Sequence, residues 1–367
     1  MPQLVGDAPG VEPRLREHFD RVTRRRGGLG APQIALRGPD VEFAYGDQQT
    51  PFHAASIGKL FTAVIVMQLV EAGRLALDSR IDELLPAATV RGLFAADAPS
   101  PTVLELLQHY SGAADYFEGR RGARLIDEVA ANPDRVWTPE EMLDFARERL
   151  GPIADPGRRF RYSDTGYVLL GLAIEEIVGE AYHDAVSTRI VEPLGLERTF
   201  LPRLTAPARG DRRIAPCYLG RQDLSGTAAL SCGWAGGGVA ATPGELLRFG
   251  EALHGGELIG EESLAVMRAM RGRVRAGIHY GAGMMQLRFD GFSPMLRGMP
   301  RPLGHLGSLS TALLYDPGSR SHLVMNFHAR REMSRSVRSA IAVARVLGRA
   351  NPRPRGPMRG SPGGTGL

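Results

Sequence analysis

The sequence predicts an α/β (α+β) protein in which one sheet is built from both ends of the chain and a mostly helical region is inserted between its strands. Segments with the composition of strands lie near both ends, at residues 33–36, 41–45, 280–287, 310–315 and 322–326. The middle of the chain, in contrast, contains several sequence signals for helix N-termini. We therefore expect residues 1–75 and 236–350 to form the α/β region around residues 76–235.

The helices are predicted from apolar spacing and capping residues. Apolar residues at helical spacing predict helices at residues 11–26, 56–72 and 331–347. Another helix, at residues 166–178, follows Asp164 as its candidate cap and ends at Gly179. Three capping boxes mark further helix starts: Thr102…Glu105, Thr138…Glu141 and Thr242…Glu245.

The bulk composition is that of a soluble globular protein. The 367 residues are 43% hydrophobic and 23% charged, enough for one large domain or two closely packed ones. The apolar stretch at residues 63–70, which contains Gln68, is far shorter than the roughly 20 residues of a membrane span. The first twenty residues have no apolar signal region, so we expect a cytoplasmic protein without membrane contact. Cys217 and Cys232 are expected to be buried thiols without a disulfide.

A net charge of +5 raises the possibility of nucleic-acid binding. Part of this charge lies in the Pro- and Gly-rich tail, residues 351–367, which is expected to be disordered. No nucleic-acid motif accompanies the remaining charge, so no such partner is expected. Metal and cofactor motifs are also missing: there is no H-E-x-x-H, and Gly236-Gly237-Gly238 lacks the lysine of a phosphate loop. We expect neither a metal nor a cofactor.

Lys59 is the only lysine of the chain. The sequence contains 45 lysines and arginines, so the other 44 are arginines. An ammonium can lose its proton inside a protein, whereas a guanidinium effectively cannot. A chain that uses arginine everywhere else therefore keeps lysine where a nitrogen must act as a base or proton relay.

Ser56 lies three residues before this lysine. Residues i and i+3 share a helix face, so the amine can reach the hydroxyl. A weak nucleophile beside a tunable base is the signature of covalent catalysis, and the helix start favours developing negative charge. The alternative is that Ser56 is an ordinary helix cap and Lys59 a solvated surface residue. The apolar flanks, PFHAASIGKLFTAVIV, argue against that alternative.

Four stretches in order resemble the class C β-lactamase and penicillin-binding-protein family, which includes DD-peptidases, D-amino-acid amidases, esterases and acyltransferases. Residues 52–85 resemble its nucleophile segment. TVLELLQHYSGAADY (102–116), RYSDTGYVLLGLAIEE (161–176) and GHLGSLST (304–311) are similar to its later motifs. The likeness covers about residues 30–345. It implies a β-lactamase/transpeptidase-like fold, with an antiparallel sheet flanked by helices.

The resemblance also implies roles for residues far from the serine. Tyr162 corresponds to the tyrosine that exchanges protons with the serine and the leaving group. Asp164 stands where the family usually has asparagine. An ionised carboxylate only accepts hydrogen bonds. Asp164 is therefore either a helix cap or a counter-ion that keeps Lys59 cationic, which would shift the base role to Tyr162.

The third motif, which the resemblance places on a strand at the sheet edge, would supply substrate-binding groups. His305 and Gly307 correspond to the family's K-T-G or H-x-G triplet, and the glycine permits close backbone approach of a substrate. The N–H groups of Ser56 and Ser308 would form the oxyanion hole by resemblance. If the His305 imidazole is unperturbed, activity should depend on its titration between about pH 5.5 and 7.5.

Together these features predict a serine hydrolase that acts through an acyl-enzyme on an ester or amide of a small molecule. One alternative is an acyltransferase of secondary metabolism that uses the same acyl-enzyme; another is a non-catalytic scaffold that binds acylated ligands, which Asp164 favours. Because an apolar pocket wall suits aryl esters, we expect these to react faster than β-lactams or D-alanyl peptides. The candidate wall residues are Tyr110, Tyr116, Phe117, Tyr280, Met284 and Met285.

Overall fold

A computed structural model describes residues 10–119 and 124–350. Its central element is one eight-stranded sheet in which all neighbouring strands are antiparallel. The strand order is β2 (Val41–Tyr45), β1 (Gln33–Gly38), β12 (Ser321–Asn326), β11 (Thr311–Asp316), β10 (Leu303–Gly307), β9 (Met285–Leu287), β8 (Ile278–Tyr280) and β7 (Gly272–Arg275). Strands from both ends of the chain thus lie side by side in one sheet. The predicted disorder of residues 351–367 lies outside the described residues.

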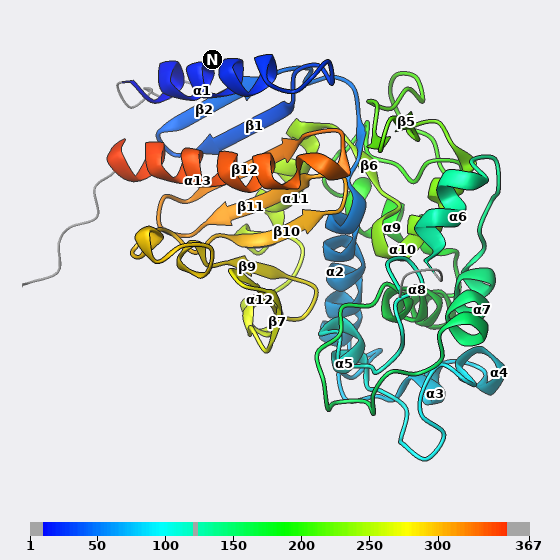
Figure 1. The fold of residues 1–367 in the computed structure, drawn as a ribbon. Coiled ribbons are helices and arrows are strands. Elements are labelled where there is room, and N and C mark those ends of the chain that lie inside the picture. The colour runs from blue at the N-terminus through cyan, green and yellow to red at the C-terminus, as the bar shows by residue number, and fades with distance from the viewer. Residues whose placement is uncertain (1–9, 120–123, 351–367) are drawn as a thin grey trace, which may run out of the picture.

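Side chains alternate between the two faces of this sheet, as the strand period requires. Leu314 and Met325 pack toward α1 (Val11–Arg24) and α13 (Met333–Ala350), which lie side by side on one face. Leu313 and Val324 belong to the larger core on the other face, which α11 (Pro243–Gly255) covers. The sheet thus has a helical layer on each side (Figure 1).

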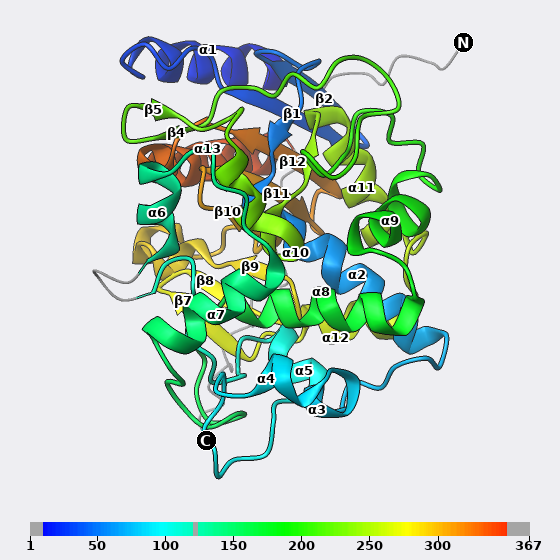
Figure 2. The same cartoon turned by 90° about the vertical axis from the view of Figure 1, so that its right-hand side faces the viewer.

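The helical region is organised around α8 (Thr165–Val178). This helix contacts α2 (Gly58–Glu71) and most of the shorter helices near it (Figure 2). Helix α2 is buried on nearly all sides, as expected of a helix that is apolar all round. The shorter helices are α3 (Ile81–Leu84), α4 (Ala87–Val90), α5 (Val103–Leu107), α6 (Leu125–Ala131), α7 (Pro139–Arg149), α9 (Tyr182–Val186), α10 (Trp234–Gly237) and α12 (Glu261–Arg268).

Two further pairs of short strands flank these helices. β3 (Phe52–His53) pairs with β6 (Ala240–Ala241), and β4 (Tyr218–Leu219) pairs with β5 (Gln222–Asp223). The first pair leads directly into α2. In the part of the chain that the structure describes, no helix has the length and hydropathy of a membrane span. Cys217 and Cys232 are free and buried, as expected.

The structure corrects several element boundaries. The strand expected at residues 280–287 is the hairpin β8–β9, whose turn is closed by the Gly281 N–H donating to the Met284 carbonyl. Strand β7 was not predicted because its side chains are mostly exposed and give no alternation. The capping boxes at Thr102 and Thr138 are confirmed. Thr242 caps α11, but the carboxylate of Glu245 binds elsewhere.

Candidate active site

Ser56 lies in a tight turn between β3 and α2. The predicted helix at residues 56–72 begins as a 3₁₀ turn, Ala55–Ile57, before α2 starts at Gly58. Ala55 has a φ of 51°, in the left-handed region that a residue with a Cβ rarely adopts. Strain of this kind costs about 1–3 kcal/mol and gathers at functional sites.

Strand β10 brings the third motif against this turn. β9 pairs with β10 only at Leu303 and Gly304, so the second half of β10 continues past β9 to the serine turn. A Cβ at Gly307 would lie 2.8 Å from the Ala54 carbonyl oxygen and 2.9 Å from the Ala55 Cβ. Gly307 therefore admits the backbone of the serine turn, and it also lines a cavity that reaches Ser56.

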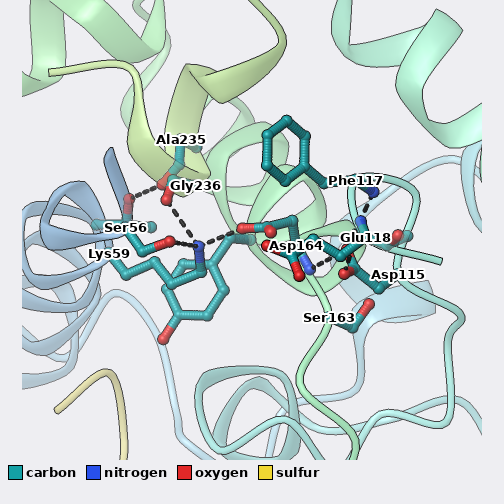
Figure 3. Close-up of polar contacts among 12 residues, drawn as sticks. Ser56, Lys59, Asp115, Phe117, Glu118, Ser163, Asp164, Ala235 and Gly236 are labelled. Carbon is teal, nitrogen blue, oxygen red and sulfur yellow. Dashed lines mark hydrogen bonds and ion pairs between the residues drawn. The ribbon is translucent and has the colours of Figure 1, made fainter. Parts of the chain in front are cut away.

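Lys59 lies directly behind the serine. Its side chain is buried, and its Nζ lies 3.4 Å from Ser56 Oγ (Figure 3). The ammonium donates to the Gly236 carbonyl at 2.7 Å and forms an ion pair with Asp164. Lys59 is therefore not the solvated surface residue of the alternative interpretation, and its proton acceptors are specific protein groups.

Asp164 occupies the N-cap position of α8, but its side chain makes no cap hydrogen bond. The carboxylate pairs with Lys59 instead, which matches the counter-ion role. Gly236 passes so close to the pair that a Cβ there would lie 2.9 Å from Asp164 Oδ1. Sequence reasoning missed Gly236 as a partner of Lys59, although the run of three glycines signalled a close backbone approach.

Tyr162 lies beside the serine and the lysine. It lines the same cavity as Ser56, and Lys59 Nζ lies 5.1 Å from the centre of its ring. Burial, with the charge of Asp164 adding to it, raises the pKa of Tyr162 well above its ordinary value. The resting phenol is therefore neutral, a form that can both donate and accept a hydrogen bond.

His305 is buried behind the site. Its Nε2 lies 3.1 Å from the Tyr280 hydroxyl and its Nδ1 lies 2.8 Å from the Leu306 carbonyl oxygen. Burial, reinforced by the charge of Lys59, lowers the pKa of His305 to about 3. The expectation that His305 titrates between pH 5.5 and 7.5 is therefore wrong. Its side chain lines neither of the two cavities that reach Ser56.

Two cavities meet at Ser56. The larger, about 1020 Å³, is lined in part by residues of the Tyr162 segment, β7, β10 and the start of α13, and in part by residues of the segment 114–119. The smaller, about 70 Å³, is mainly apolar. Tyr116 and Phe117 line the smaller cavity and Met285 the larger, whereas the other predicted wall residues line neither: Tyr110, Tyr280 and Met284. Ser308 lines both cavities, directly after β10.

Asp115 is a site residue that the sequence analysis did not single out. Its carboxylate accepts hydrogen bonds from the N–H groups of Asp164 and Phe117, both at 3.1 Å, and of Glu118 at 3.0 Å. Burial and the neighbouring charge of Asp164 raise the pKa of Asp115 to about 7. The only sequence signal was its place in the segment 102–116.

This pKa predicts a pH-dependent stability. The folded state favours protonated Asp115, so the stabilisation is complete in acid and is lost as the pH rises toward and through about 7. Relative to Asp115→Asn, which cannot ionise, the wild type should lose about 2 kcal/mol of unfolding free energy between about pH 5 and pH 8. Urea denaturation at both pH values measures this difference, with the exposed Asp134→Asn as control. If wild type and Asp115→Asn differed in unfolding free energy by the same amount at both pH values, the raised pKa of Asp115 would be contradicted.

Known proteins share this sequence pattern and fold. The model of the Beta-lactamase family matches residues 37–347. Penicillin-binding protein 4 of Amycolatopsis lactamdurans is 34% identical over 176 residues, which are 46% of this chain and 40% of that protein. Esterase EstB of Burkholderia gladioli is 28% identical over 205 residues, covering 52% of this chain and 51% of the esterase. The chain thus spans about half or less of the length of these relatives.

Solved structures agree on the fold. The D-amino acid amidase of Ochrobactrum anthropi SV3 superposes with a TM-score of 0.77 at 22% identity, over 93% of this chain and 99% of the amidase. EstCE1, described as a hydrolase with promiscuous acyltransferase activity, gives a TM-score of 0.69 at 18% identity, over 91% and 98% of the two chains. With the family model covering most of the sequence, the chain belongs to the Beta-lactamase family.

Proposed function

We propose that this protein is a serine hydrolase that forms an acyl-enzyme at Ser56 with an ester or amide of a small molecule. The observation that carries the proposal is the position of the Ser56 hydroxyl, which lies 3.4 Å from a buried lysine at the junction of two cavities. A nucleophile, a proton-handling amine and room for both parts of a substrate are thus brought together.

In the proposed mechanism, Lys59 first passes a proton to Asp164 and becomes a neutral amine. Ser56 Oγ then attacks the substrate carbonyl while its proton moves to that amine, directly or through Tyr162. The carbonyl electron pair moves to the oxygen, which the N–H groups of Ser56 and Ser308 stabilise; such a donor contributes about 2.7–4 kcal/mol. The proton returns through Lys59 to the leaving group as its bond to the acyl carbon breaks. Water then cleaves the acyl-enzyme.

Replacing Asp164 tests the first of these steps. Asp164→Asn keeps the shape of the side chain but removes the charge that stabilises the Lys59 ammonium. Without this acceptor the proposed transfer from Lys59 to Asp164 cannot take place, so kcat/KM should fall by at least about tenfold, roughly 1.4 kcal/mol of barrier. Steady-state kinetics of wild type and variant measure the loss, and thermal unfolding checks that the variant folds. An unchanged kcat/KM would show that Asp164 does not take the proton of Lys59.

Substrate choice tests the function itself. Aryl esters with short acyl chains should acylate Ser56 faster than β-lactams or D-alanyl peptides, because a cavity of about 70 Å³ beside the serine has little room for bulky groups. Intact-protein mass spectrometry against a panel of esters, amides and β-lactams detects the acyl-enzyme directly. A chromogenic cephalosporin that reacts faster than the aryl esters would overturn this preference. If no substrate acylates the protein, the non-catalytic scaffold becomes the better explanation.

The acyltransferase alternative is favoured by one feature of the site. The larger cavity, about 1020 Å³, has space for an acceptor beside Ser56, and the fold neighbour EstCE1 is described as having promiscuous acyltransferase activity. Millimolar amine or alcohol acceptors should then divert a measurable share of the acyl group from water. Chromatography of the products with and without acceptor decides the matter, and hydrolysis that no acceptor affects would leave a plain hydrolase.

A further inference from the structure

The two cavities at Ser56 differ in size and in chemistry. Both are lined by Ser56, Ser308 and Arg330, so they meet where a substrate carbonyl has to lie for attack. A carbonyl bound there has two substituents, the acyl group and the leaving group. Each cavity is therefore available to one of them.

The smaller cavity suits a short apolar group. Its lining includes Phe117, Ile126, Val129 and Leu224, and its volume is about 70 Å³. Tyr116 forms another part of the wall and is held in place because its hydroxyl donates to the Cys232 carbonyl at 2.6 Å. The two charged side chains of the lining, Asp164 and Arg330, are already paired with Lys59 and Glu118. The remaining, largely apolar wall disfavours a charged group, because such a group would lose its hydration without compensation.

The larger cavity carries three arginines without protein counter-ions. Arg161 directly precedes Tyr162, and Arg273 and Arg275 lie on strand β7. All three are exposed, and none has an ion-pair partner within residues 10–119 and 124–350. The fourth arginine of the lining, Arg330, is different: it binds both carboxylate oxygens of Glu118, at 2.6 and 2.8 Å.

The acidic groups of the larger cavity do not offset this charge. Glu118 is neutralised by Arg330, and Asp115 faces the backbone N–H groups that it binds. The part of the cavity formed by β7 and the Tyr162 segment is therefore positively charged. Such a surface attracts anions and raises their local concentration beside the serine.

We propose that the substrates of this enzyme combine a short apolar acyl group, held in the smaller cavity, with a leaving group that carries a negative charge and is bound by Arg161, Arg273 and Arg275. The leaving group is assigned to the larger cavity because it must depart to solvent before water attacks, and the exposed arginines show that this cavity opens to solvent. This inference rests on the proposed function and names its substrate class.

Aryl acetates that differ only in charge test the inference. The probes are phenyl acetate, 4-carboxyphenyl acetate and 4-(trimethylammonio)phenyl acetate, each corrected for its rate of hydrolysis by hydroxide. The corrected kcat/KM should be highest for the carboxylate and lowest for the cation. Arg273→Gln and Arg275→Gln should each lower kcat/KM for the carboxylate about three- to fivefold while leaving phenyl acetate within about twofold. Added salt should weaken the preference in the same direction.

Arg297→Gln is the matched control. Arg297 is also exposed and its loss changes the net charge equally, but it lines a separate cavity beside Asp290 and Arg301. It should leave all three probes unchanged. Equal corrected rates for the three probes, or a carboxylate preference that survives removal of all three arginines, would overturn the anion site.

The same experiment separates this inference from the proposed function. Turnover of phenyl acetate and acylation of Ser56 report on the hydrolase, whereas the ratio between probes reports on the arginines. If no ester is turned over, the proposed hydrolase function is refuted. Calorimetric titration with 4-hydroxybenzoate then still measures whether the arginines bind an anion. Binding that weakens in Arg273→Gln but not in Arg297→Gln supports the site; binding unaffected by both contradicts it.

Discussion

A fluorophosphonate is expected to label one residue, Ser56, and Ser56→Ala is expected to abolish both the label and the turnover of aryl esters. Ser56 alone has an amine within reach, because Lys59 is the only lysine and its Nζ lies 3.4 Å from the Ser56 hydroxyl. Loss of the nucleophile should lower kcat/KM by about four orders of magnitude or more, roughly 5 kcal/mol of barrier.

Peptide mapping of the labelled protein gives the decisive measurement. Ser308 is the matched control because it lines the same cavities, so Ser308→Ala should keep the label. Ser111 and Ser310 are buried, and the Ser310 hydroxyl donates to the Ala329 carbonyl at 2.7 Å. An adduct on any of these three serines instead of Ser56 would refute the assignment of the nucleophile.

The second large effect is expected from Lys59→Arg, which should be nearly inactive although it keeps the positive charge. The lysine has to alternate between ammonium and amine, and a guanidinium effectively never loses its proton. The surroundings also fit an ammonium closely, since Nζ contacts the Gly236 carbonyl, Asp164 and Ser56 in a fully buried position.

Steady-state kinetics with phenyl acetate measure the loss, and Lys59→Met serves as the comparison that removes the charge as well. Both variants should fall by similar factors if proton transfer is the essential property. Thermal unfolding and circular dichroism separate inactivity from failure to fold. An arginine variant that keeps more than about a tenth of kcat/KM, a loss of less than about 1.4 kcal/mol, would reduce Lys59 to an electrostatic role.

The features that could be predicted are those that depend on neighbours in sequence. Strand segments at both ends, helix caps such as Thr138 and the pairing of Ser56 with Lys59 follow from residue type and spacing over a few positions. The resemblance added Tyr162, which the structure places at the serine. The boundaries failed where the local pattern was ambiguous, as in the continuous apolar run that forms the hairpin β8–β9.

The sequence by itself determined the fold class and the closeness of Ser56 to Lys59, because alternation, capping and helical spacing are local properties of the chain. The family followed from the resemblance of four ordered stretches. Only the tertiary structure decided what surrounds the pair. Asp164 and Gly236 reach Lys59 across separations of 105 and 177 residues, and the buried His305 ring contacts the hydroxyl of Tyr280 from another strand. Whether a side chain titrates, caps a helix or binds a substrate depends on its desolvation and on the charges around it. Those quantities arise from packing between distant segments, which no local pattern records.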